Sequence, residues 1–129
     1  MDQLTDALAA SLDLVAERCG DPTELVYDRL FTRQPEMRAL FLGDQSRQAR
    51  GQMLNMVLDT LTNMAAGETW AGNMIRAERI NHDQIGVPFD VFATFFIVVH
   101  ETFRDAAGGA WTDEMEDAWT DVLARAAAA

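Results

Sequence analysis

The chain has 129 residues, enough for one domain with a single hydrophobic core, and 49% of them are apolar, as in ordinary globular proteins. Its formal net charge of −11 would repel a nucleic acid backbone or an anionic membrane surface, so neither is expected as a partner. All ten basic residues are arginine, which excludes lysine Schiff-base chemistry, and the single cysteine, Cys19, excludes an internal disulfide.

The first third of the chain predicts three helical segments, because apolar residues recur there at every third or fourth position. The first helix ends at Cys19-Gly20, where glycine favours a helix stop. Asp21-Pro22 then predicts a cap with proline in the first turn of a second helix. Pro35 begins a short helical turn, PEMRALF, and residues 42–46 form a turn.

The rest of the chain predicts three or four more helices. A long one is expected from about Ser46 to Ala66, and a shorter one from about Trp70 to Asn81. Pro88 opens a strongly apolar helix that runs to about Arg104, and Thr112 caps a final helix after the loop AAGGAW. The prediction is therefore an all-α fold of six or seven helices in a single domain, residues 1–129.

Two observations bear on location. The longest apolar run, residues 91–99, is too short to cross a bilayer. The N-terminus has acidic residues and no basic region, so it does not resemble a signal peptide. A cytoplasmic protein is the default expectation.

The sequence lacks most of the residue patterns that mark catalytic or metal-binding sites. Gly-rich phosphate loops are absent, and two histidines with one cysteine are too few for a closed zinc site. His82 stands out within ERINHDQIGVPF, residues 78–89, at the end of a predicted helix. A histidine there can simply satisfy the terminal carbonyls of the helix, or it can bind a metal. The pattern alone leaves both readings open.

A single imidazole is enough for one task, which is to ligate the iron of haem. Haem also needs an apolar slot and a polar group on the opposite wall. Tyr27, the only tyrosine, lies on an otherwise apolar helix face, so its hydroxyl needs a partner if it is buried. Six apolar residues could line such a slot: Phe41, Met53, Val57, Val87, Phe92 and Phe96.

Three segments resemble the bacterial single-domain globins, which are related to the globin domain of flavohaemoglobins. LVYDRLFTRQPEMRALF, residues 25–41, is similar to their second and third helices. HDQIGVPFDVF, residues 82–92, is similar to the segment that begins at their proximal histidine, and AWTDEMEDAW, residues 110–119, to the start of their last helix. The three segments occur in the right order along almost the whole chain. The resemblance implies a globin-like fold around a haem pocket.

The resemblance also implies roles for individual residues. His82 would ligate the iron of a non-covalent haem b through one ring nitrogen, while a carbonyl or side chain holds the other nitrogen. Phe41 would be the corner phenylalanine that packs on the porphyrin, and Tyr27 the distal donor of a hydrogen bond to the bound gas. Val87 and Phe92 would lie on the side of His82, and Arg79 could reach a haem propionate.

The distal wall is left with alternatives. The inner stripe of the long helix places Met53 over the haem and Ala49 where many relatives have glutamine or histidine. A slip of one residue offers Arg50 instead, and Gln48 is a third choice. With Ala49 there, Tyr27 would be the main donor, helped by Gln52. No histidine is available on this wall, so a second histidine ligand is not expected.

Two departures from the family limit the functional inference. Flavohaemoglobin-like members have a tyrosine and a glutamate behind the proximal histidine that favour oxygen activation. Here Phe92 stands in the place of the tyrosine, and the sequence ends before the place of the glutamate. The resemblance therefore implies a proximal side of the ligand-binding kind. The sequence also has no flavin or nicotinamide domain, so sustained nitric oxide dioxygenation would need a separate reductase.

Three functions remain, in this order. The first is a haem-binding globin that reversibly binds oxygen or another diatomic gas, such as nitric oxide or carbon monoxide. The second is a haem enzyme, a nitric oxide dioxygenase that works with a separate reductase. The third is a haem-free sensor or interaction module, which is ranked last because His82 is present. Exposed apolar positions on the last two helices could pair two subunits in a homodimer.

Overall fold

The structure, a computed structural model, describes residues 3–129. Within that range it contains six α-helices, two short 3-10 helices and no strand, which confirms the predicted all-α, globin-like fold. The helices are α1 (Gln3–Cys19), α2 (Thr23–Arg33), α3 (Gln48–Ala65), α4 (Thr69–Gln84), α5 (Phe89–Ala107) and α6 (Asp113–Ala128). The 3-10 helices are η1 (Pro35–Phe41) and η2 (Gly108–Ala110), the second of which lies inside the predicted loop.

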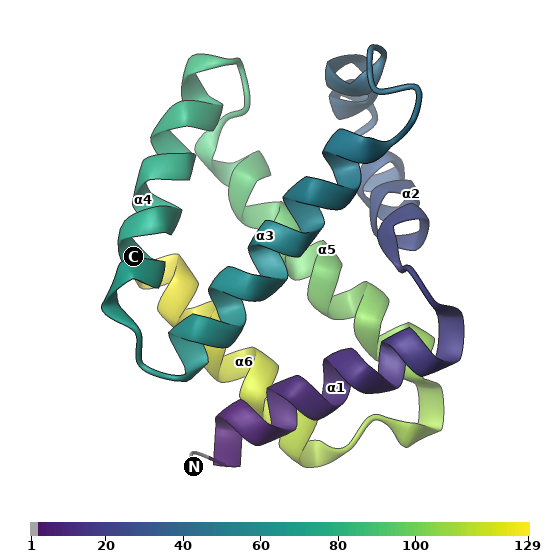
Figure 1. Ribbon diagram of the computed structural model, residues 1–129. Coiled ribbons are helices and arrows are strands. Elements are labelled where there is room, and N and C mark those ends of the chain that lie inside the picture. Colours follow the sequence, from purple (N-terminus) through teal and green to yellow (C-terminus); the bar gives the residue numbers. More distant parts are fainter. Residues whose placement is uncertain (1–2) are drawn as a thin grey trace.

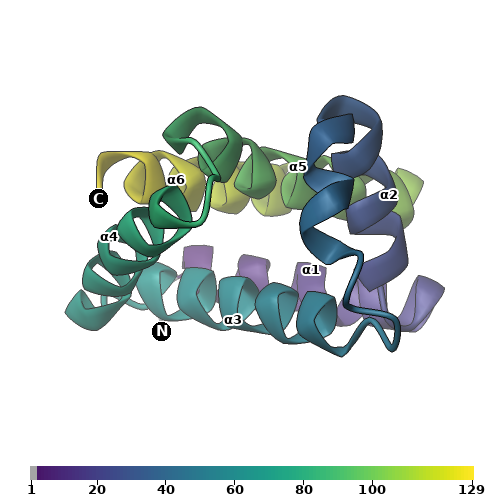
Figure 2. The same ribbon diagram turned by 90° about the horizontal axis from the view of Figure 1, so that it is seen from above.

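The helices form two layers, with α1 and α3 in one and α5 and α6 in the other (Figure 1 and Figure 2). Helices α2 and α4 lie at opposite ends of the layers (Figure 2). No helix among the described residues is long and apolar enough to cross a membrane.

The best-packed part of the core lies where α1, α5 and α6 meet. Leu8, Val99 and Trp119 are each no more than 1% exposed. The indole nitrogen of Trp119 donates a hydrogen bond to the Ser11 hydroxyl at 2.9 Å, which satisfies a polar group that burial would otherwise penalise. The pocket described below lies away from this cluster, in the space between α2 and α4.

Ion pairs on the surface connect helix α2 to helix α5. Arg29 and Arg33 both pair with Glu101, and Arg29 also pairs with Asp105. Such exposed pairs contribute little individually, about 0–1 kcal/mol each. Together with the buried face of α2, which includes Val26 and Leu30, they fix the position of that helix.

The start of α3 differs from the sequence prediction by two residues. The helix was expected from Ser46 and begins at Gln48. The reason is the Asp44 side chain, whose carboxylate oxygens accept hydrogen bonds from the backbone nitrogens of Ala49 and Arg50, each at 3.1 Å. Asp44 thereby satisfies two amides of the first turn, while Arg47 takes a left-handed conformation with φ 62°.

Helix α4 is longer than predicted, and this decides the place of His82. The helix continues through Gln84, so His82 lies in its last turn rather than just after its end. It stops in a Schellman arrangement: Val87 N donates to His82 O at 2.9 Å and Gly86 N donates to Asp83 O at 3.1 Å. Gly86 has φ 91°, a conformation that glycine adopts at no steric cost.

Helix α6 begins as predicted. The Thr112 hydroxyl accepts a hydrogen bond from Met115 N at 3.1 Å, the N-terminal cap that the sequence indicated.

Candidate functional site

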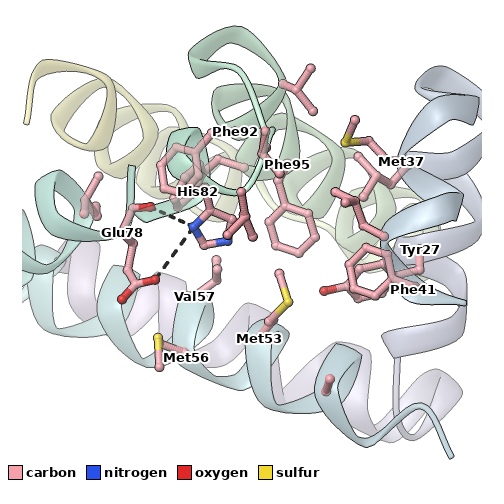
Figure 3. Close-up of a pocket in the computed structure, with 18 of the residues that line it drawn as sticks. Tyr27, Met37, Phe41, Met53, Met56, Val57, Glu78, His82, Phe92 and Phe95 are labelled. Atoms are coloured by element: carbon pink, nitrogen blue, oxygen red, sulfur yellow. Dashed lines mark hydrogen bonds and ion pairs between the residues drawn. The ribbon is translucent and has the colours of Figure 1, made fainter. Parts of the chain in front are cut away.

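A cavity of about 380 Å³ lies at the end of the molecule between α2 and α4. Segments α2, η1, α3, α4 and α5 all contribute to its wall (Figure 3). Most of its lining is apolar: Leu30, Met37, Leu40, Phe41, Ala49, Met53, Met56, Val57, Met74, Ile75, Ile85, Val87, Val91, Phe92, Phe95 and Phe96. The polar residues in the wall are Tyr27, Asp44, Thr60, Glu78 and His82. This is an apolar slot with a few polar groups, the usual form of a cofactor site.

His82 enters the pocket from α4 with a defined orientation. Its Nδ1 atom lies 2.7 Å from the backbone oxygen of Glu78, one turn earlier in the same helix. A carbonyl oxygen can only accept a hydrogen bond, so Nδ1 donates and the lone pair of the neutral ring is on Nε2. Figure 3 shows this second nitrogen turned away from Glu78, toward the interior of the pocket. The ring of Phe92, 5.1 Å away between centroids, packs against the imidazole.

Tyr27 faces the same pocket from α2, on the opposite side (Figure 3). The residue is 2% exposed and its ring lies among Phe31, Phe41 and Phe95, with centroid separations between 5.3 and 5.9 Å. Its hydroxyl has no hydrogen-bond partner among the described residues, a state that costs about 1–3 kcal/mol. Burial raises the pKa of this phenol far above its ordinary value, so the hydroxyl stays protonated and can donate a hydrogen bond. A buried donor is thus aimed at the cavity.

Helix α3 closes the wall between these two residues. Ala49 and Met53 line the cavity, whereas Gln48 and Gln52 are exposed and lie outside its lining. Of the three alternatives for the distal position, the structure brings Ala49 to the pocket. It does not bring Gln52 beside Tyr27 as a second donor.

Arg50 lies beside Phe41 and is not part of the pocket lining. Its Nη2 atom donates to the backbone oxygen of Phe41 at 3.3 Å, and its guanidinium lies 5.3 Å from the centre of the Phe41 ring. Its Nε atom is 3.5 Å from an Asp44 carboxylate oxygen, close enough for charge attraction but without a hydrogen bond. Arg50 therefore positions Phe41, whose ring lines the cavity.

Arg79 lies on a neighbouring cavity between α4, α5 and α6. Its Nη2 atom donates to the backbone oxygen of Ala129 at 2.7 Å, and its guanidinium lies over the Phe89 ring. The structure thus places Arg79 outside the pocket of His82. Val87 and Phe92 line that pocket beside His82.

The second histidine, His100, has partners of its own in α6 and in the segment that precedes it. Its Nε2 atom is 2.9 Å from a Glu116 carboxylate oxygen, and its ring stacks on Trp119 at an angle of 4°. The indole nitrogen of Trp111 donates to the same Glu116 oxygen at 2.9 Å. His100 is accordingly a structural residue whose ring nitrogen has a partner.

Sequence reasoning missed nine apolar residues of the pocket wall and three of its five polar residues. Glu78 could have been found, because a residue four positions before His82 lies on the same face of a helix. Asp44 and Thr60 gave no such signal: Asp44 lies in an irregular turn, and Thr60 follows from the inner stripe of α3 only once its rotation is known. Among the described residues, no three His, Cys, Asp or Glu side chains gather as a direct metal site would require.

The structure is thus that of an all-α protein in which the imidazole of His82 and the buried phenol of Tyr27 lie on opposite sides of one apolar pocket. The sequence matches the family model described as Globin over residues 24–129, and the chain belongs to the globin family. Globins generally bind haem and, through it, diatomic gases. No curated protein and no solved structure matches the chain significantly.

The residues of this pocket fit haem. The Nε2 atom of His82 is free to ligate a metal, and the buried Tyr27 hydroxyl lacks a partner that a bound ligand would supply. The apolar lining suits the faces of a porphyrin.

Proposed function

We propose that this globin binds haem b non-covalently through the Nε2 atom of His82 and reversibly binds oxygen or another diatomic gas. When bound, the haem iron supplies an open coordination position for the gas. The observation that carries the proposal is the pairing of an oriented imidazole with an unpartnered, buried phenol across one apolar pocket. A resemblance to bacterial single-domain globins supports the same function.

His82 has the two properties that a protein ligand of haem iron would need. Its ring is fixed, because Nδ1 is held by the Glu78 carbonyl and the helix end is closed by Gly86 and Val87. A hydrogen bond on the far nitrogen selects the tautomer and increases the basicity of the nitrogen that binds the metal. Rotation of the ring away from the pocket would break that bond.

Tyr27 supplies polarity where the rest of the wall is apolar. Its proton is retained because burial disfavours the phenolate. A hydrogen bond from this hydroxyl to a partly negative gas ligand is strengthened by the low dielectric of the surroundings. Since Ala49 has no polar group, we expect Tyr27 to be the main donor to the gas.

A second candidate is nitric oxide dioxygenation with a separate reductase. The net charge of −11 favours this second function, because an acidic protein surface attracts a basic electron donor. Turnover with an added reductase, compared at low and high salt, separates this enzyme from a gas carrier, because attraction between exposed charges weakens as salt is added.

The proposal is tested by titrating the purified protein with haem and recording absorption spectra, first oxidised and then reduced. We expect one haem per chain and a five-coordinate reduced spectrum that changes reversibly with oxygen. His82→Ala should lose or alter this spectrum, whereas His100→Gln, which changes the other histidine, should keep it. Failure of the protein to bind haem, or an unchanged spectrum in His82→Ala, would overturn the proposal.

A further inference from the structure

Two oxygen atoms of Glu78 face the same nitrogen of His82. The backbone oxygen lies 2.7 Å from Nδ1 and accepts its hydrogen bond. The carboxylate Oε2 atom lies 3.7 Å from Nδ1, beyond hydrogen-bond length but within reach of its charge (Figure 3). Glu78 is part of the pocket wall, so this acid lies beside the ligand and not on a remote surface.

The carboxylate has no competing cation in the part of the chain that is described. Arg79, next in sequence, is engaged with Ala129 and Phe89, and Arg76 with Asn73. The side chain of Glu78 is 32% exposed and that of His82 is 22% exposed. Solvent therefore screens the attraction between the two side chains only in part.

We propose that Glu78 is a positioning residue whose negative charge increases the electron donation of His82 to iron. The proposal rests on the proposed function, in which His82 ligates haem. A carboxylate near the N–H of a ligating imidazole draws that proton toward itself and makes the opposite nitrogen a stronger donor. A stronger donor stabilises the oxidised metal more than the reduced one.

The functional consequence is a bias in the chemistry of the site. The hydrogen bond to the backbone oxygen of Glu78 would by itself orient His82 without adding a full negative charge beside it. The added carboxylate shifts the ferric–ferrous equilibrium toward the ferric state and favours transfer of electron density to a bound gas. Glu78 thus provides, from the helix of the ligand itself, an acid behind His82 that the sequence did not predict.

The test uses Glu78→Gln, which removes the charge and keeps both the side-chain length and the backbone oxygen. The iron–histidine stretching frequency of the reduced, gas-free protein is measured by resonance Raman, and the ferric–ferrous equilibrium by redox titration. We expect a lower frequency in the variant and a shift toward the ferrous state of roughly tenfold, which is about 59 mV for one electron.

The matched control is Asp83→Asn. It removes the same charge from the same helix turn, next to His82, but that carboxylate forms no recorded hydrogen bond or ion pair with the imidazole. We expect it to shift the equilibrium by less than about twofold, because an exposed charge is screened by water and salt. Equal shifts in Glu78→Gln and Asp83→Asn, or none in either, would overturn the inference.

Two further results keep the outcomes distinct. Absence of an iron–histidine band in the unmodified protein would refute ligation by His82, and with it the proposed function. A normal band that does not change in Glu78→Gln would refute only the role of Glu78. If Glu78→Gln fails to fold, Glu78→Asp, which withdraws the charge by one methylene, should lower the frequency by a smaller amount, and an unchanged frequency there would refute the role.

Discussion

Replacement of Tyr27 by phenylalanine removes one oxygen atom, and its effects on the haem-free and haem-loaded proteins should have opposite signs. In the haem-free protein the hydroxyl is buried without a partner. The cost of such a group is about 1–3 kcal/mol, and water that enters the pocket reduces it toward the lower value. We therefore expect Tyr27→Phe to raise the free energy of unfolding of the haem-free protein by about 1 kcal/mol.

In the haem-loaded protein the same change should weaken gas binding. A hydrogen bond to a partly charged acceptor contributes about 1.5–3 kcal/mol, which corresponds to roughly a tenfold to hundredfold loss of oxygen affinity. Most of this loss should appear as faster dissociation, because the barrier to entry is unaffected.

The assays are urea unfolding of the haem-free protein and stopped-flow oxygen dissociation from the reduced, haem-loaded protein. Phe31→Leu, which alters a neighbouring ring without removing a polar group, is the control for packing. The reasoning would be refuted if Tyr27→Phe destabilised the haem-free protein by more than about 1 kcal/mol and left oxygen dissociation unchanged. That result would mean that the hydroxyl serves the fold.

Three further predictions concern the distal wall of the pocket, the contact of Phe41 with haem, and the Glu116 carboxylate outside the pocket. Ala49→Gln places a new amide donor in the pocket and should slow oxygen dissociation about tenfold, because one hydrogen bond is added. The control is Gln52→Ala, which lies outside the lining and should leave the rate unchanged. An effect of Gln52→Ala alone would contradict this orientation of α3. Phe41→Ala should speed haem loss to an acceptor protein roughly thirtyfold, from a loss of about 2 kcal/mol of contact, and an unaltered rate would remove Phe41 from the haem contact. The pKa of the Glu116 carboxyl is lowered because hydrogen bonds from His100 and Trp111 outweigh the opposing, larger single effect of burial. Its contribution to stability is therefore complete above the unfolded pKa of about 4.3 and is lost as pH falls through the lower folded pKa. Glu116→Gln should then lower stability at pH 6 more than at pH 3 in urea unfolding, and a difference independent of pH would contradict this.

The helices could be predicted from the sequence because their ends carry strong local signals. Gly20 and Gly67 have positive φ after helices α1 and α3, and Thr112 caps α6. The helix boundaries that were predicted wrongly include the end of α4, which is set by backbone hydrogen bonds around Gly86, and the start of α3. Helix α3 starts later than predicted because the Asp44 carboxylate accepts hydrogen bonds from the backbone nitrogens five and six residues ahead of it.

The pocket was predictable in composition but not in its polar details. A helical face with three- and four-residue spacing places Met53 and Val57 together, so their presence in the lining follows from the sequence. Whether the Tyr27 hydroxyl finds a partner depends on the three aromatic rings around it, which come from α2, η1 and α5. The orientations of the Arg50 and Arg79 side chains depend likewise on acceptors in other segments, the backbone oxygens of Phe41 and Ala129.

The central claim is that the imidazole of His82 is the protein ligand of the haem iron. The most direct test is His82→Gly, studied by absorption and resonance Raman spectroscopy with and without added imidazole. The account predicts that the variant loses the five-coordinate histidine spectrum and the iron–histidine band, and that free imidazole, which fits the space left by the side chain, restores both. A variant that keeps both features without imidazole would show that another residue ligates the iron and would contradict the account.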